Sequence, residues 1–165
     1  MAKGFDRKRQ RQAPKEFDQK LVDLARVTRV VAGGRRFRFR AAVVLGNRRG
    51  RVGMGVAKGA DVSQAVEKAV NKAQKNLIDI SLDGRTITHE VRTKYKGALV
   101  LLKPCREGTG IIAGGAVRAV VELAGVKDIV SKMLGSNNKI SNIRATLKAL
   151  QSLETKNEIL KRRGK

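Results

Sequence analysis

Arginine is the residue with the clearest chemical potential in this sequence, and it is concentrated in one acid-free segment. No aspartate or glutamate lies between Asp23 and Asp61, whereas this segment carries ten basic residues, nine of them arginine. A merely solvated face would normally mix both signs of charge, while a guanidinium can grip a phosphate with two parallel hydrogen bonds. The segment therefore predicts an RNA-binding surface formed by Arg26, Arg29, Arg35, Arg36, Arg38, Arg40, Arg48, Arg49, Arg51 and Lys58.

The stretch Arg36–Arg40 alternates arginine with phenylalanine, which is typical of a β-strand. Successive side chains of a strand point to opposite faces, so the arginines share one face and Phe37 and Phe39 the other. We expect both phenylalanines to lie in the core. Aromatic residues make up only 3% of the chain, too few for a platform on which unpaired bases stack. The expected target is structured RNA, recognised by its backbone and shape.

A glycine-rich loop, residues 108–115, is the second feature that could carry chemistry, because amides before a helix can bind a phosphate. A nucleotide-binding enzyme is therefore the competing hypothesis. The loop lacks the lysine and Ser/Thr of a phosphate loop, and no carboxylate pair is spaced for metal ions. We interpret Glu107 and Asp128, the nearby acids, as surface charges. We expect no enzymatic activity and no cofactor, and interpret the loop as tight packing or a protein contact.

His89 and Cys105 are each the only residue of their type. One cysteine excludes an internal disulfide and suits a reducing cytosol, and one histidine excludes a multi-histidine metal site. His89 is predicted to be a packing residue on an apolar strand face. We assign no catalytic or metal-binding role to either side chain.

The balance of charge restricts the class of partner. The 165 residues include 37 Lys+Arg and 14 Asp+Glu, a net charge of +23, and such a protein repels itself unless a polyanion neutralises it. Nucleic acid is the expected partner. A membrane surface, the alternative, would require large apolar anchors or a lipid, and no apolar run approaches the ~20 residues of a membrane span. The N-terminus lacks the apolar core of a secretory signal, so we expect a cytoplasmic protein without membrane association.

The first half of the chain must supply the elements that position the arginines. Residues 1–20 are interpreted as a basic tail that is disordered or folds against RNA. Residues 21–57 are predicted to form three antiparallel strands, with turns at Gly33-Gly34 and at residues 46–50.

An apolar stripe at helical spacing then predicts a helix over residues 61–78 that packs on this sheet and closes a first domain. Asp61 and Gln64 are positioned to form a capping box at its start. The second half is predicted to contain strands at 85–92, at 98–103 and within 126–133, and helices at 116–124, ended by Gly125, and from Ser141 or Asn142 to about 153. Residues 156–165 are interpreted as a second basic tail.

Two long motifs resemble signatures of one known family. The first comprises GGRRFRF, residues 33–39, and GNRRGRVGMGVAKGADV, residues 46–62; the second is EGTGIIAGGAVRAVVELAGV, residues 107–126. Both are similar to motifs of the bacterial-type small-subunit ribosomal protein S5 (S-five) family. The resemblance covers residues 21–153.

This resemblance implies an α+β fold with two small α/β domains between the tails. The first, residues 21–79, would be a double-stranded-RNA-binding-like domain with a three-stranded sheet and a helix. The second, residues 80–155, would be a left-handed βαβ domain of a kind shared with some small-molecule kinases. The resemblance also implies a structural component of the cytoplasmic ribosome that binds small-subunit ribosomal RNA. Its expected partners are ribosomal proteins S-four and S-eight, and messenger RNA where it enters the subunit. Its expected roles are assembly, messenger entrance and translational accuracy.

The resemblance also marks individual residues. The RNA-facing loops of the family, one near the spectinomycin site and one a basic turn, match Gly33, Gly34, Arg35, Arg48, Arg49 and Arg51. Gly110 and Arg118 match the surface that faces protein S-four, where substitutions in the family affect fidelity.

Overall fold

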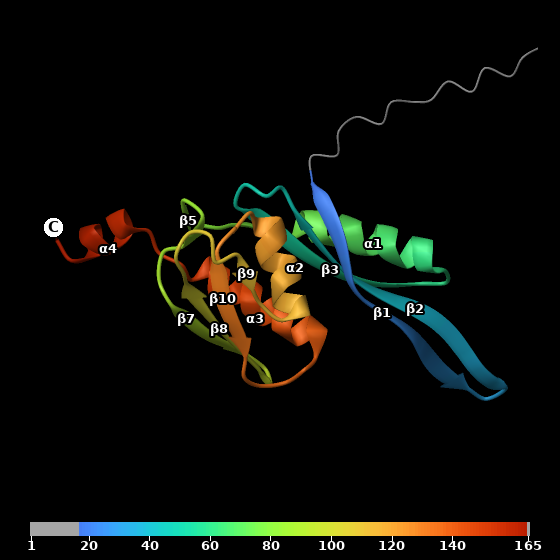
Figure 1. Cartoon of the computed structure of the whole chain (residues 1–165). Coiled ribbons are helices and arrows are strands. Elements are labelled where there is room, and N and C mark those ends of the chain that lie inside the picture. Colours follow the sequence, from blue (N-terminus) through green and yellow to red (C-terminus); the bar gives the residue numbers. More distant parts are fainter. Residues whose placement is uncertain (1–16, 165) are drawn as a thin grey trace, which may run out of the picture.

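The computed structural model describes residues 17–164, except for the side chains of residues 156–158, and contains two four-stranded sheets with helices packed against them (Figure 1). The first sheet is antiparallel and has the order β1-β2-β3-β4. Its strands and helix are β1 (Asp18–Val31), β2 (Gly34–Gly46), β3 (Arg51–Gly59), α1 (Val62–Lys75) and β4 (Leu77–Asp79). These elements confirm the α+β class, and β4 adds a fourth strand to the three that were predicted.

The second sheet has the order β7-β8-β10-β9, and a short hairpin, β5-β6, precedes it. The later elements are β5 (Leu82–Asp83), β6 (Thr86–Ile87), β7 (Val91–Tyr95), β8 (Ala98–Pro104), β9 (Ile111–Ile112), α2 (Gly115–Ala124), β10 (Ile129–Met133), α3 (Lys139–Gln151) and α4 (Lys156–Arg162). Strands β7, β8 and β10 pair antiparallel, whereas β10 and β9 pair parallel. Within residues 17–164, no helix combines the length and apolarity that crossing a membrane requires.

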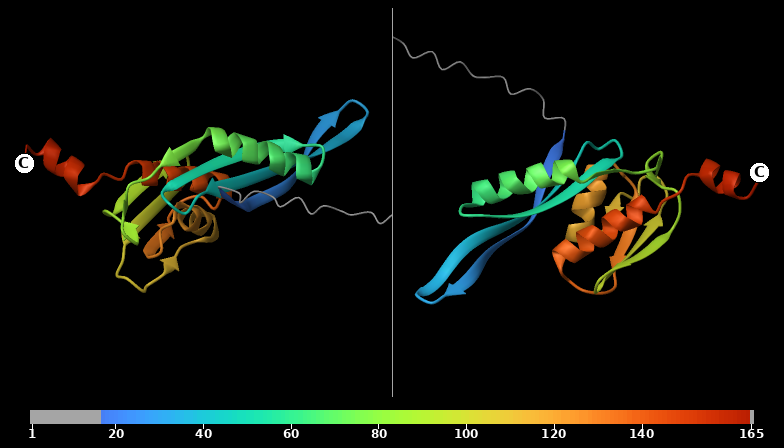
Figure 2. Two further views of the ribbon diagram at one scale, coloured as in Figure 1. Left: turned by 90° about the horizontal axis from the view of Figure 1, so that it is seen from above. Right: turned by 180° about the vertical axis from the view of Figure 1, so that it is seen from behind.

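Strands β1 and β2 extend beyond the rest of their sheet. Pairing of β2 with β3 begins at Phe39, so the preceding residues Gly34–Arg38 pair with β1 alone. The outer parts of β1 and β2 therefore form a two-stranded ribbon that projects away from the body in all three views (Figures 1 and 2). The turn at its tip is the predicted one: Gly34 has a φ of +135°, a conformation that glycine adopts without steric cost.

Helix α1 packs on one face of the first sheet through a stripe of small residues. Ala65, Ala69 and Ala73 are buried and share a cluster with β2 residues such as Val43. The helix starts after Asp61, whose side chain makes no capping hydrogen bond, so the predicted capping box is wrong. It also ends before residue 78. Asn76 leaves the helical conformation, and the next residues pair with β3 as strand β4.

The opposite face of the first sheet shares one core with the second half of the chain. Residues Val44, Val52 and Met54 belong to the same buried cluster as Val121 of α2 and Leu150 of α3. Because side chains alternate across a strand, the even-numbered residues of β2 and β3 face this second half while the odd-numbered residues of β2 face α1. The two predicted domains are therefore joined by continuous apolar packing.

A backbone clamp also joins the two halves. The turn between β2 and β3 donates hydrogen bonds to the end of α2, from Arg48 N to Leu123 O at 3.0 Å and from Gly50 N to Ala124 O at 2.9 Å. Such bonds satisfy carbonyls that a helix end leaves without internal partners. Gly125 ends α2 with a φ of +97°, as the sequence predicts.

Two other predictions need correction. The strand expected over residues 85–92 is divided, because Arg85 lies in the β5–β6 turn and a separate strand starts at Val91. Helix α3 is capped by Asn138, whose side chain accepts from the amides of Ile140 and Ser141, so neither Ser141 nor Asn142 is the cap.

The structure of the two ends of the chain also differs from the prediction of two tails. Strand β1 begins at Asp18, inside the predicted N-terminal tail, because residues 18–20 pair with the end of β2. The rest of that tail, residues 1–16, lies outside the described residues. At the other end, helix α4 occupies most of the predicted C-terminal tail.

Candidate nucleic-acid interface

One face of the ribbon carries most of its arginines. The register of β1 and β2 places Arg29 opposite Arg36, Val27 opposite Arg38 and Ala25 opposite Arg40. Directly paired residues of antiparallel strands lie on the same face, so Arg29, Arg36, Arg38 and Arg40 form one surface, which we call the arginine face. Arg29, Arg36 and Arg38 are exposed. This is the common face that the alternating pattern predicts.

The other face of the ribbon combines cations with exposed apolar side chains. Phe37 is 47% exposed, so the prediction that it lies in the core is wrong, since the ribbon extends past α1. The Arg26 guanidinium instead lies 3.8 Å from the centroid of the Phe37 ring, a cation–π contact that orients the arginine. Phe39, two residues nearer the body, does pack against the α1 cluster.

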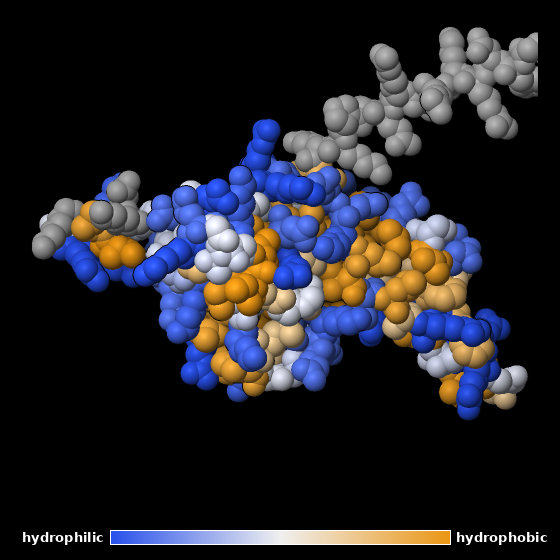
Figure 3. Space-filling model, in the orientation of Figure 1, coloured by the Kyte–Doolittle hydropathy of each residue, from blue (hydrophilic) through white to orange (hydrophobic). Residues whose placement is uncertain are grey.

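The ribbon tip is open to a ligand. Gly33, Gly34 and Arg35 are exposed, and no heavy atom lies within 4 Å of the position where either glycine would carry a Cβ atom. A phosphate backbone can therefore approach the main chain there. The ribbon, at the lower right of Figure 3, carries strongly hydrophilic side chains with paler and apolar ones between them.

Three of the predicted cations already have carboxylate partners. The pairs are Arg40 with Asp23 at 3.2 Å, Arg48 with Asp18 at 2.8 Å, and Arg51 with Asp79 at 2.6 Å. All three acids lie outside the acid-free segment, and strand pairing brings them beside it. Reasoning along the sequence missed these pairs. Surface pairs contribute about 0–1 kcal/mol, so a phosphate could replace the carboxylate, but the unpaired arginines are better placed to bind first.

The remaining predicted cations, Arg49 and Lys58, lie away from the ribbon tip. Both are exposed. Lys58 of β3 lies opposite Arg40 and so continues the arginine face onto the body. Arg49 is held in the second turn by Asn47, whose side-chain oxygen accepts from its amide at 2.8 Å.

The glycine-rich loop is organised by Asp128, and the prediction that this residue is a surface charge is wrong. Asp128 is only 1% exposed and is not a surface charge. Its carboxylate accepts hydrogen bonds from the Gly110 amide at 2.8 Å and from Arg85 Nε at 2.9 Å. These contacts, with the Gly110 amide first and Arg85 next, lower the pKa of Asp128. The available signal was that Asp128 directly precedes the apolar residues Ile129 and Val130.

Arg118 closes the same loop from the helix side. Its guanidinium donates to the carbonyl of Ile111 at 2.7 Å, and Gly110 accepts a hydrogen bond from the amide of Ile129 at 3.1 Å. Gly110 and Arg118 thus belong to one loop-and-helix unit with a defined shape, which suits a protein contact. Neither His89, half-buried beside Thr88, nor the half-buried Cys105 is part of this unit. No group of three or more potential metal ligands gathers anywhere in the described part of the chain.

Comparison with known proteins identifies the family. The model described as "Ribosomal protein S5, N-terminal domain" matches residues 17–81, and the one described as "Ribosomal protein S5, C-terminal domain" matches residues 93–163. The chain belongs to the ribosomal protein S5 family. It is similar to the "Small ribosomal subunit protein uS5" of Campylobacter jejuni, for example in strains 81-176 and RM1221. Each of these relatives is 54% identical over 139 residues, which cover 84% of this chain and 95% of the relative.

Membership of the S5 family decides between the two hypotheses for the glycine-rich loop. The family consists of structural components of the small ribosomal subunit, which act in translation and are not enzymes. The nucleotide-binding enzyme is thereby excluded, and the ribosome of the cytoplasm is the place of action.

The lowered pKa of Asp128 predicts how the stability of this S5-family protein changes at acidic pH. A carboxylate with a lowered folded pKa contributes stability that is complete above its unfolded pKa, about 3.9, and is lost as the pH falls through the folded pKa. Asp128→Asn removes the charge that Arg85 pairs with but keeps an oxygen for the Gly110 amide. We expect the variant to be less stable at pH 7 and the difference from wild type to shrink below about pH 4. Melting temperatures measured from about pH 2 to about pH 7 test this prediction; an equal deficit at every pH would contradict it.

Proposed function

We propose that this protein binds small-subunit ribosomal RNA through the arginine face and the tip of the β1–β2 ribbon. The observation that carries the proposal is the grouping of exposed Arg29, Arg36 and Arg38 on one projecting face. A ribbon only two strands wide can be approached from either side, and its guanidinium groups present donors in a fork that matches a phosphate. Such contacts recognise the backbone and shape of folded RNA rather than its sequence.

We also propose that the loop-and-helix unit around Gly110 and Arg118 contacts ribosomal protein S-four. The fixed shape of the loop, held by buried Asp128, supports a protein contact. Contacts with S-eight and with messenger RNA where it enters the subunit complete the proposed role in assembly and translational accuracy. Cross-linking in reconstituted subunits checks the assignment: links from this unit to a protein other than S-four would contradict it.

Charge reversal on the arginine face tests the main proposal. Both side chains of Arg36→Glu with Arg38→Glu are exposed, so the fold should persist while RNA binding weakens on the order of a hundredfold or more. If about six phosphates are neutralised, wild-type affinity should fall roughly a thousandfold between about 50 and 200 mM salt. Binding titrations with small-subunit ribosomal RNA, alone and in particles lacking this protein, give both quantities.

A matched control separates this surface from net charge alone. Arg92→Glu with Lys94→Glu changes the charge equally at two exposed positions of β7, outside the ribbon. This control should bind RNA nearly as wild type does. Equal losses in the two variants would mean that only overall charge matters, and circular dichroism of the same samples shows whether either variant unfolds.

A further inference from the structure

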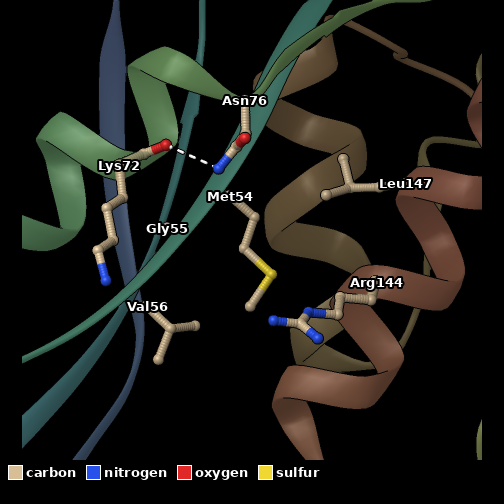
Figure 4. Close-up of a pocket in the computed structure, with 7 residues that line it drawn as sticks. All are labelled: Met54, Gly55, Val56, Lys72, Asn76, Arg144 and Leu147. Carbon is tan, nitrogen blue, oxygen red and sulfur yellow. Dashed lines mark hydrogen bonds between the residues drawn. The ribbon is translucent and has the colours of Figure 1, made fainter.

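A groove with basic walls lies at the open edge of β3, outside the ribbon (Figure 4). Strand β4 pairs with β3 only along Arg51–Gly53, so in the described chain the edge from Met54 onward has no strand beside it. Helices α1 and α3 stand on either side of this edge. The cavity has a volume of about 350 Å³ and is lined by Met54, Gly55, Val56, Lys72, Asn76, Arg144 and Leu147.

The charged side chains that line this groove are all positive. Lys72 on α1 and Arg144 on α3 lie on opposite sides of β3 (Figure 4). Within the described residues, the lining contains no carboxylate. Each wall is extended by further exposed cations, Lys75 one helical turn after Lys72 and Lys148 one turn after Arg144. Helix α3 carries no acid at all. This arrangement attracts an anion rather than an apolar segment of a protein.

Arg144 is held in place before any ligand arrives. It donates a hydrogen bond to the Tyr95 hydroxyl at 2.8 Å, and its guanidinium lies 5.7 Å from the centre of the Tyr95 ring. The same hydrogen bond lowers the pKa of Tyr95. A side chain that is already oriented loses less conformational entropy when it binds. The groove therefore has a preorganised cation on one wall and a lysine on the other.

The groove also continues the arginine face of the ribbon. In the pairing of β2 with β3, Arg40 lies opposite Lys58 and Ala42 opposite Val56, so Lys58 and Val56 are on the same side of the sheet as the ribbon arginines. Arg40, which is paired with Asp23, and Lys58 thus lie between the ribbon arginines and the groove, where Val56 forms part of the lining.

We propose that this groove is a second RNA site, in which Lys72 and Arg144 hold a phosphate group of the same small-subunit ribosomal RNA. This inference rests on the proposed function, because the ribbon and the groove would bind one polyanion. The apolar floor accommodates the sugar that accompanies the phosphate, and the volume is within the range of small-ligand sites. The site would fix how the body of the protein lies on the RNA once the ribbon is bound.

Salt-dependent titration of the full-length chain tests the groove. Each phosphate contact contributes about 0.7–0.9 to the slope of log affinity against log salt. Lys72→Ala with Arg144→Ala should therefore reduce the slope by about 1.4–1.8 and weaken binding on the order of 10- to 100-fold near about 0.1 M salt. The control, Arg92→Ala with Lys94→Ala, removes the same two residue types from β7 and should change neither quantity. Lys72→Ala alone, which leaves the Arg144–Tyr95 contact intact, should reduce the slope by about one.

The outcomes separate this inference from the proposed function. If wild type shows no salt-dependent binding to the RNA, alone or in particles lacking this protein, the proposed function fails. If wild type binds and the groove variants keep the slope of the control, the groove inference is overturned while the ribbon proposal stands. Unchanged RNA binding with loss of assembly into subunits would assign the groove to an acidic protein and likewise overturn it.

Discussion

A fragment of residues 17–81, the part that matches the N-terminal S5 domain, is expected to lose cooperative folding when it is separated from the rest of the chain. Val44, Val52 and Met54 of its sheet are buried against α2 and α3 in the full chain. Exposing three such side chains costs about 4.5–9 kcal/mol, at about 1.5–3 kcal/mol each, which is comparable to the whole stability of a small domain. Thermal unfolding followed by circular dichroism should show a broad, non-cooperative change.

Mixing provides the control for this fragment. A second fragment, residues 82–164, supplies the buried partners in α2 and α3, and an equimolar mixture should regain a cooperative transition. A sharp transition in the first fragment alone would contradict the prediction and show that the shared core is dispensable. The result matters for function. If the first fragment does not fold alone, RNA binding by the ribbon must be measured on the full chain.

Local patterns were sufficient to predict the elements that carry the arginine face. The alternation over Arg36–Arg40 and the glycine pair before it predicted a strand, a turn and a common arginine face, and the structure contains all three. These are properties of residues close together in sequence, where the strand period and the φ preference of glycine decide the outcome. The same holds for the end of α2 at Gly125.

Prediction was wrong where distant residues decide the environment of a side chain. Phe37 resembles Phe39 in sequence, yet only Phe39 reaches the cluster beneath α1. Asp128 was interpreted as a surface charge, but its partners Gly110 and Arg85 lie 18 and 43 residues away. Burial and ion pairing of this kind depend on the packing of elements against one another, which period and composition do not specify.

The groove between α1 and α3 was beyond sequence reasoning for the same reason. Lys72 and Arg144 are 72 residues apart by their numbering, and each alone has the pattern of an ordinary exposed cation on an amphipathic helix. The edge of β3 from Met54 onward is open because β4 starts only at Leu77, opposite Gly53, and the cavity lies along this open edge. The short strand itself was missed, because residues 77 and 78 also fit the helical stripe.

Gly125→Ala is expected to lower the free energy of unfolding strongly, because it disrupts the backbone clamp between the β2–β3 turn and α2. Gly125 has a φ of +97°, and an added Cβ atom would overlap the carbonyl group of Arg48. The turn would have to move, at the expense of the bonds that Arg48 and Gly50 donate to α2. Left-handed backbone costs a non-glycine residue about 1–2 kcal/mol, and the two hydrogen bonds add about 1 kcal/mol each. We therefore expect a loss of about 3–4 kcal/mol in the free energy of unfolding.

Gly108→Ala is the matched control, because Gly108 has a similar φ of +85° but no heavy atom within 4 Å of its Cβ position. It carries the backbone strain without the collision, so it should cost only about 1–2 kcal/mol. Chemical denaturation of both variants measures the difference. Equal losses would show that the clamp contributes nothing beyond backbone strain. A larger loss in Gly125→Ala would show that the turn and α2 hold the two halves of the molecule together, and with them the relative positions of the ribbon and the groove on the RNA.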